Sequence, residues 1–242
     1  MQGILFSFLS EYGTLFLEGL VTTLILAFVG TIVGFFLGLF LALARNIKKN
    51  PTDTKMQILL KSSGYILSTI YVQFFRGTPM MVQAIILFFG SSAVGFSWDP
   101  LVCGLVVISL NTAAYMAEII KSGINAIDPG QMEAARSLGM SHFQAMNCVI
   151  FPQAIKNSIP SIGNELIVNI KDSSVLNVIM ITELFYAAQT AYTDTYNIIA
   201  SYGTVCIIYL ILTLGVAQIL KLIEKRFQVG HLKKIKRGNI HG

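Results

Sequence analysis

Charged residues are scarce in this sequence. Asp, Glu, Lys and Arg make up 12% of its 242 residues, whereas 54% are hydrophobic. Soluble domains carry about a quarter of charged residues, roughly twice this share. A mean hydropathy of +0.69 goes with the low charge. This composition argues against a soluble globular protein and indicates a chain whose solvent is largely a lipid bilayer.

Cysteine and histidine are also few, with three residues of each. Cys103, Cys148 and Cys206 are widely spaced and the histidines do not cluster, so neither disulfides nor a bound metal is expected. We expect the cysteines to be small packing residues. No nucleophile–base pair is apparent, which argues against a membrane enzyme. No basic residue precedes the first apolar run, so we expect no cleaved signal peptide.

Long apolar runs are what the sequence has in place of charge. About 20 apolar residues suffice for a helix to cross the hydrocarbon. We therefore predict an all-α integral membrane protein with five spanning helices in one transmembrane domain over 1–242, with its core at about 15–226. The predicted spans are 15–44, 79–96, 101–120, a more polar one within 158–188, and 202–223.

Apart from Arg76 and Lys171, the basic residues lie in three segments, namely 45–61, 121–156 and the end of the chain from 221. The other two connections contain no Lys or Arg. Because basic loops stay in the cytoplasm, we predict an outside N-terminus and a cytoplasmic C-terminus. The basic C-terminal tail, 227–242, is then expected to anchor at the membrane surface rather than to bind nucleic acid.

Two segments do not resemble simple spans. Residues 56–75 mix Lys, Ser and apolar side chains, and they suit either a helix along the inner face or the inner part of a long second helix. Thr78 followed by Pro79 favours a new helix start, so we predict a break there. Residues 153–185 contain Pro160 and several charges, which predicts an interrupted helix shielded from lipid.

A stripe of glycines follows one face of the first span at four-residue steps, at Gly30, Gly34 and Gly38. Helices approach one another closely along such stripes. The partner is either a neighbouring span of the same chain or a second subunit. Five helices are few for enclosing a pathway, so a dimer is plausible on physical grounds.

The loop 121–156 contains a polar stretch with strong helix signals, "QMEAARSLGMSHFQAMNCVIFP". Asp128, Pro129 and Gln131 occupy the N-cap, N1 and N3 positions of a predicted helix, at capping-box spacing. Gly139 is placed to end that helix in a left-handed conformation.

Ser141 and Gln144 then predict the start of a second helix, again at capping-box spacing. Its apolar side chains fall on one face at helical steps, at Phe143, Met146, Val149 and Ile150. The segment is either a solvated connector or a hairpin that docks a cytoplasmic partner through this face.

These motifs together resemble one family, the permease subunits of ATP-binding-cassette (ABC) importers for polar amino acids, in the histidine/glutamine/glutamate permease group. The family's cytoplasmic motif is matched by Glu133, Ala134, Ala135, Gly139 and Pro152. Val149 and Phe151 stand where the motif has Ile and Leu, and both keep an apolar side chain. The stretches 74–83, 114–131 and 171–176 also resemble the amino-acid subgroup.

The resemblance implies a type I importer permease fold with five helices, working as a homo- or heterodimer in a bacterial cytoplasmic membrane. It implies two cytoplasmic ATPase subunits that carry ATP and Mg, and an extracytoplasmic protein that delivers a polar amino acid. This chain has no G-x-x-x-x-G-K-[ST] motif and so no ATP site of its own. A fused binding domain is not expected either.

Within this family the hairpin transmits ATPase movement to the membrane helices. The expected coupling residues are Glu133, Ala134, Ala135, Arg136, Gly139 and Pro152, with Glu133 and Arg136 close enough in sequence to pair. The alternative function is a self-sufficient channel or secondary transporter. Secondary transporters often contain inverted repeats, and no internal repeat is visible here.

Polar residues inside predicted spans are candidates for the substrate pathway. They are Gln83, Asn111, Glu118 and Glu165, of which Glu118 lies near the inner end of its span. A carboxylate facing a cavity could hold the ammonium group of an amino acid, so we favour Glu165 and Asn111, with Gln83 beside them. The alternative is hydrogen bonding between helices, or a local pair between Lys171 and Asp172.

Overall fold

The structure is a computed structural model that describes residues 2–46 and 53–238, with side chains over 8–46 except residue 9, and over 53–225. Helices are the only regular elements in these ranges, so the prediction of an all-α protein is confirmed. The side chains of the basic tail, 227–242, lie outside the described residues.

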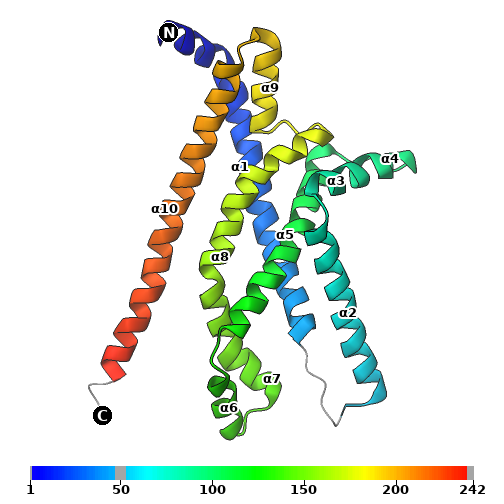
Figure 1. The fold of residues 1–242 in the computed structure, drawn as a ribbon, viewed down its shortest axis with the longest axis vertical. Coiled ribbons are helices and arrows are strands. Elements are labelled where there is room, and N and C mark those ends of the chain that lie inside the picture. Colours follow the sequence, from blue (N-terminus) through cyan, green and yellow to red (C-terminus); the bar gives the residue numbers. More distant parts are fainter. Residues whose placement is uncertain (1, 47–52, 239–242) are drawn as a thin grey trace.

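The elements follow one another along the chain with short connections (Figure 1). They are α1 (Gln2–Asn46), α2 (Lys55–Gly77), α3 (Met80–Ile85), a π-helix (Ile86–Gly90), α4 (Ser91–Ala93), α5 (Pro100–Asn125), α6 (Pro129–Ser137), α7 (His142–Ala145), a second π-helix (Met146–Ile150), α8 (Phe151–Asp172), a 3-10 helix (Ser173–Ile179), α9 (Leu184–Thr195) and α10 (Ile198–Gly238).

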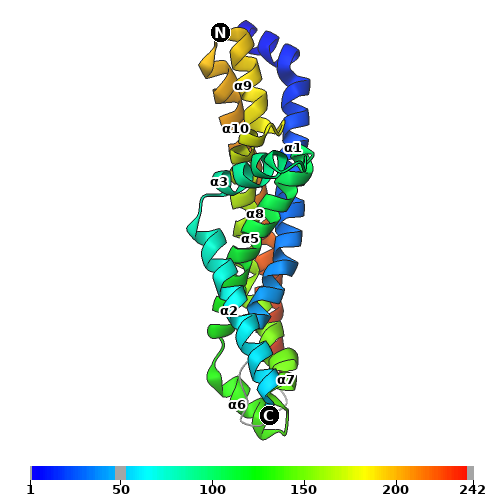
Figure 2. The ribbon, with the colours of Figure 1, turned by 90° about the vertical axis from the view of Figure 1, so that its right-hand side faces the viewer.

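The molecule is long and narrow, and its longest helices run lengthwise (Figures 1 and 2). The helices α1, α5 and α8 pack together as the centre, α2 lies beside α1 and α5, and α10 lies beside α8 and α9. Figure 1 places the start of α1 and α9 at one end. The α6–α7 hairpin and the far end of α10 lie at the other, so the chain begins and ends at opposite ends.

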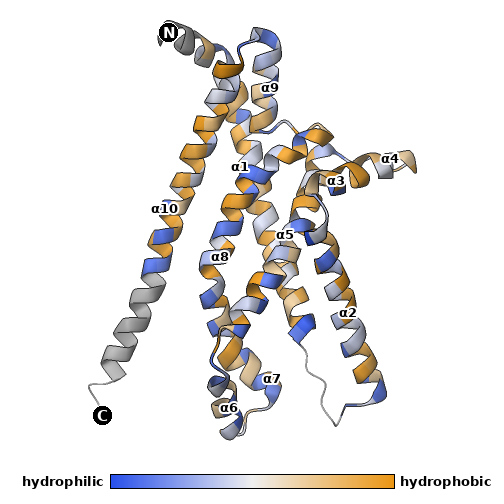
Figure 3. Ribbon diagram, in the orientation of Figure 1, coloured by the Kyte–Doolittle hydropathy of each residue, from blue (hydrophilic) through white to orange (hydrophobic). Residues whose placement is uncertain are grey.

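Three helices are long and apolar enough to cross a membrane, over Ser10–Asn46, Pro100–Asn125 and Ile198–Lys225. Apolar residues dominate α1 and α10 in Figure 3. In α10 no residue between 206 and 225 is fully buried, and many of its apolar side chains are exposed, among them Ile207, Leu210, Ile211 and Leu214. These spans match the predicted first, third and fifth. The fourth, α8, is more polar, as expected, and falls below that threshold.

The short span predicted over 79–96 does not stand as a span by itself. The helix from Met80 ends at Ala93, and it is bent by 106° from α2 across the break after Gly77. The break itself was predicted from Thr78 and Pro79. Of the two expectations for 56–75, the helix along the inner face is wrong, because α2 runs lengthwise beside α1 and α5 (Figure 1). The other, the inner part of a second span, fits a span broken after Gly77.

The interruption predicted within 153–185 lies later than Pro160 suggested. The helix α8 continues past Pro160 to Asp172, although proline cannot donate the usual backbone hydrogen bond. Regular α-helix stops where the chain tightens into the 3-10 turn from Ser173. The chain then turns at Met180, with φ +66°, before Glu183 caps α9.

The cysteines only partly meet the expectation that they are packing residues. Cys103 is buried in the core, with 0% of its surface exposed. Cys148 and Cys206 are exposed. Cys206 lies on the outward face of α10, and Cys148 lies in the π-helix that leads into α8, so neither fills space inside the bundle.

The glycine stripe of α1 packs against α5 of the same chain. A Cβ on Gly34 would lie 2.7 Å from Thr112, and one on Gly38 would lie 2.7 Å from the backbone oxygen of Ala113. Gly30 faces Ile108 in the same way. Of the two partners considered for this stripe, the structure shows the neighbouring span.

One buried amide joins the three central helices. Asn169 on α8 donates from Nδ2 to Thr31 Oγ1 on α1 at 2.8 Å, and its Oδ1 accepts from Thr112 Oγ1 on α5 at 3.1 Å. All three side chains are at most 9% exposed. In a medium without water such bonds replace the solvation that these groups lose.

Adding a methyl group to the α1 stripe should loosen the bundle. Gly38→Ala would place a carbon against the backbone of Ala113 and Ala117, which cannot rotate away, and should cost about 1–3 kcal/mol. We expect a lower unfolding temperature and a lower yield in detergent. Gly13→Ala, on the same helix with nothing within 4 Å, is the control and should behave as wild type.

Candidate functional site

The first helix of the hairpin, α6, begins and ends as predicted. Asp128 is its N-cap, although its Oδ1 accepts from Gly130 N at 2.7 Å and forms no capping box with Gln131. Gly139 follows the helix with φ +84°. The amide of Met140 then bonds back to Ala135 O at 3.2 Å, closing the helix end.

The second helix of the hairpin also starts as predicted but does not stay short. Ser141 and Gln144 form a full capping box, each side chain bonding the other's backbone N–H. From His142 the helix passes through the π-helix directly into α8. Pro152 lies just after the π-helix, where its missing N–H and its ring disfavour ordinary α-helical spacing. The second helix of the hairpin is therefore continuous with α8.

The pair predicted between Glu133 and Arg136 is wrong. Arg136 Nη1 donates to Met140 O at 3.3 Å, and Glu133 forms no ion pair within the described part of the chain. Arg136 thus helps to close α6 rather than to pair with Glu133. The carboxylate of Glu133 is exposed and available to a partner.

The tip of the hairpin exposes two large apolar side chains. Leu138 is 83% exposed and Phe143 is 74% exposed, while Ala135 between the two helices is 4% exposed. Phe143 was expected on an apolar face. Leu138 was missed, although its place directly before Gly139 marks a turn tip. Of the rest of that face, Ile150 is buried and serves the hairpin's own packing.

Gln83 and Asn111 meet at the elbow between α2 and α3. Gln83 Nε2 donates to Phe75 O, Thr78 O and Thr78 Oγ1 at 2.9–3.1 Å. Asn111 Nδ2 donates to Gln83 Oε1 at 3.1 Å and to Phe75 O at 3.3 Å. The two amides therefore hold the 106° bend by bonding carbonyls at the end of α2, as the alternative of hydrogen bonding between helices anticipated.

A polar cavity of about 330 Å³ lies between the end of α2, the second half of α5, and α8. Its wall includes Arg76, Tyr115, Glu118, Ser122 and Ser161. Since the wall extends along α5 toward the start of α6, the cavity lies on the hairpin side of the bundle. The elbow amides are outside its lining.

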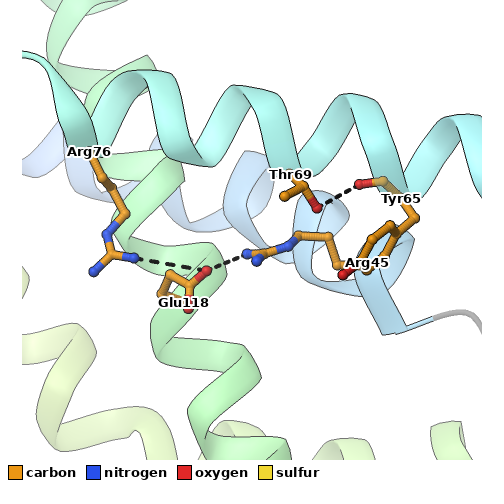
Figure 4. A network of polar contacts seen from close by, with 5 residues as sticks. All are labelled: Arg45, Tyr65, Thr69, Arg76 and Glu118. Atoms are coloured by element: carbon orange, nitrogen blue, oxygen red, sulfur yellow. Dashed lines mark hydrogen bonds and ion pairs between the residues drawn. The ribbon is translucent and has the colours of Figure 1, made fainter.

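Glu118, near the inner end of the predicted third span, lies in this wall. Its Oε1 is bonded by Arg45 at the end of α1, and Arg76 Nη1 lies 3.9 Å from the same oxygen (Figure 4). Arg76 also lies over the Tyr115 ring at 5.5 Å. The sequence did not predict this cluster, because its members are far apart along the chain.

Glu165 is a buried carboxylate, 8% exposed, one turn beyond Ser161 on the same face of α8. No hydrogen bond or ion pair joins it to another described side chain. Glu183 offers a contrast, because it is fully buried and accepts from two backbone amides and from Tyr209. Lys171 and Asp172 are exposed and form no ion pair in the described chain.

A bundle with long apolar helices, a cavity bordered by α2, α5 and α8 and a capped hairpin at one end indicates a helical membrane protein. The comparison with known proteins is more specific. Residues 56–229 match the family described as binding-protein-dependent transport system inner membrane component. The match covers most of the chain, so the protein belongs to this family and is a multi-pass membrane protein.

Similar proteins agree with this family. The chain is 38% identical over 165 residues to a putative glutamine transport system permease of Rickettsia bellii, covering 68% of this chain and 76% of that protein. It is 39% identical over 163 residues to an arginine transport system permease of Bacillus subtilis, covering 67% and 74%.

The solved structure of an amino acid ABC transporter matches with a TM-score of 0.81 and 37% identity, covering 90% of this chain and 96% of the other. The fold is therefore that of a type I ABC importer permease, as the resemblance implied. The family match begins at residue 56, so α1 precedes the matched region.

The elbow gives a prediction that follows from its hydrogen bonds. Gln83→Ala removes the amide that bonds Phe75 O, Thr78 O and Asn111 Nδ2, and it should destabilise the protein by about 1–3 kcal/mol. Thermal unfolding of the purified protein measures this. Gln189→Ala, an exposed position on α9, is the control, and an equal effect of both changes would contradict the assignment.

Proposed function

We propose that this chain is the permease subunit of an ATP-driven importer for a polar amino acid, that it works as a dimer, and that ATPase subunits drive it through the α6–α7 hairpin. The observation that carries the proposal is the hairpin itself. It is closed by caps at both helices, it exposes Leu138 and Phe143 at its tip, and its second helix continues into α8.

The coupling role follows from this connection. Exposed apolar side chains on a rigid turn suit a groove on a partner. Glu133 adds an exposed charge, and the small side chain of the exposed Ala134 beside it leaves room for a partner to approach the helix closely. Ala135 lets the two helices pack, and Gly139 sets the angle between them. A push on the hairpin then reaches the cavity along α8 without crossing a flexible loop.

The partners follow from what the chain does not supply. It has no G-x-x-x-x-G-K-[ST] motif, so ATP and Mg are bound by separate ATPase subunits and this subunit is not catalytic. An extracytoplasmic protein delivers the amino acid, as the family's description as binding-protein-dependent supports. Similar permeases are named for glutamine and arginine, which supports a polar amino acid as the cargo.

A dimer fits the exposed surface of the bundle. In one chain the described residues that border the cavity come from α2, α5, the turn after α5 and α8, which leaves space for a second chain beside it. A homologous permease, either a second copy or a related chain, closes the pathway, and lipid covers the remaining apolar faces of α1 and α10. The N-terminus lies outside and the C-terminus lies in the cytoplasm, in keeping with the basic residues that flank the hairpin end.

Within the pathway, Glu165 is the strongest candidate for contact with the cargo. It is a buried carboxylate without a partner, and such a group is costly unless another charge arrives. Asn111 has its Oδ1 free of the elbow bonds, and Gln83 positions it. The ammonium group of an amino acid fits both acceptors.

The function can be tested with the complete complex. The permease would be reconstituted in proteoliposomes with its ATPase and binding protein, and the twenty labelled amino acids would be offered one at a time. ATP-dependent uptake of a polar amino acid supports the proposal. A permease that purifies without an ATPase under mild detergent, and that transports alone, would instead favour a channel or secondary transporter.

Gly139→Asp should separate ATP hydrolysis from uptake. A left-handed backbone costs an L-residue about 1–2 kcal/mol, so the substitution should change the angle between the hairpin helices and leave the membrane bundle intact. We expect normal insertion and dimer yield, and continued ATP hydrolysis. Uptake should fall at least about tenfold, because a small displacement of a hairpin helix is enough to misalign the coupled parts. Normal uptake in proteoliposomes would refute the coupling role.

Glu165→Gln should reduce uptake while improving or preserving stability. The substitution removes a buried charge that has no partner, so the protein itself has little to lose. The cargo would lose its counter-charge, and we expect uptake to fall about tenfold or more. Glu18→Gln, on the exposed face of α1, is the control. Unchanged uptake in Glu165→Gln and Asn111→Ala would remove both residues from the pathway.

A further inference from the structure

Three charged side chains from three helices meet at the wall of the polar cavity (Figure 4). They are Arg45 at the end of α1, Arg76 near the end of α2 and Glu118 on α5. Both arginines direct their Nη1 atom toward the same carboxylate oxygen, Oε1 of Glu118. One carboxylate is thus shared by two cations, and the cluster carries one net positive charge.

The two arginines are held very differently. The Arg45 side chain is 5% exposed and is hydrogen-bonded to Glu118. The Arg76 side chain is 43% exposed and lies 3.9 Å from that carboxylate. Its other contact is the face of the Tyr115 ring, 5.5 Å from the guanidinium carbon. Exposed ion pairs and exposed cation–π contacts are each weak, so the place of Arg76 depends on both partners.

We propose that Glu118 is a positioning residue for the transport cavity. Arg45 fixes its carboxylate, and the carboxylate together with Tyr115 holds the Arg76 guanidinium at the cavity wall. The inference rests on the proposed function, since it requires the cavity to lie on the path of the cargo. It adds a role for α1, which lies before the region that matches the family.

The charges on the cavity wall show what the position of the Arg76 guanidinium controls. Among the described residues that line the cavity, Arg76 is the one cation and Glu118 the one anion. The charge of Glu118 is already balanced by Arg45. The potential that a zwitterionic cargo meets in the cavity is therefore set by Arg76. A shift of that guanidinium changes the potential even if no residue of the wall is lost.

Exchanging the two charges of the Arg45–Glu118 pair distinguishes two roles of Glu118. One is to join α1 to α5, and the other is to hold Arg76 at the cavity wall. In Arg45→Glu/Glu118→Arg the ion pair between α1 and α5 can form again with its polarity reversed. Arg76 then faces a cation in place of a shared anion and is pushed from the wall. The matched control is the exchange Asp53→Lys/Lys61→Asp, which reverses an ion pair of 2.7 Å outside the cavity.

We expect the Arg45/Glu118 exchange to assemble with an unfolding temperature near wild type, and to lose about tenfold or more of its maximal uptake rate. The probe is the amino acid that the wild-type complex transports fastest. Its KM should change little, because the delivery protein captures it. Glu118→Asp should keep most of the rate, and the Asp53/Lys61 exchange all of it. Recovery of wild-type uptake in the Arg45/Glu118 exchange would overturn the proposal.

A second measurement needs no cargo. Electron cryo-microscopy of the Glu118→Gln complex should show the Arg76 guanidinium displaced from the Tyr115 ring, relative to the wild-type complex. An Arg76 that keeps its wild-type place overturns the proposal, even if the exchanged variant fails to assemble. If the wild-type complex transports no amino acid, the proposed function fails, and the position of Arg76 still decides the role of Glu118.

Discussion

The close packing of α1 on α5 is the contact on which the rest of the bundle depends. Lipid tails are as apolar as leucine, so helices in a bilayer gain little by hiding apolar side chains from it, and packing distance decides their association. Gly34 brings the α1 backbone against Thr112. Thr31, three residues earlier, can then share the Asn169 amide with Thr112. A wider spacing of α1 and α5 would break this three-helix bond.

The same lack of water makes the partners of each carboxylate inside the bundle important. Glu183 satisfies its carboxylate at the start of α9 with two backbone amides and Tyr209, and so it stabilises that end of the molecule. Glu118 has two arginines. Glu165 alone of these three is buried without a bonded partner in the described chain. A carboxylate in such a place is costly unless it is neutral or meets a countercharge, which is the reason for proposing Glu165 as a contact of the cargo.

Features encoded by neighbouring residues were predictable from the sequence, and features that join distant residues were not. Caps act within four residues, so Ser141 and Gln144 predicted the second helix of the hairpin, and Thr78 with Pro79 predicted the elbow. The family resemblance supplied the fold. The Arg45–Glu118 pair spans 73 residues and the Asn169–Thr31 bond spans 138. Hydropathy also misplaced the second span, because α2 contains lysine and serine and the apolar run after it is bent.

The hairpin is attached to two of the three helices that border the cavity. The helix α5 leads into α6, and α7 leads into α8. A Cβ on Gly123 of α5 would lie 2.7 Å from Ala154 O of α8, and Ser158 bonds Ile119 O at 3.3 Å, so these helices are tightly packed near the hairpin. We infer that a pushed hairpin moves α5 and α8 together. On this inference, α2 is the described helix against which the cavity changes shape, and its Arg76 is held there by two weak contacts.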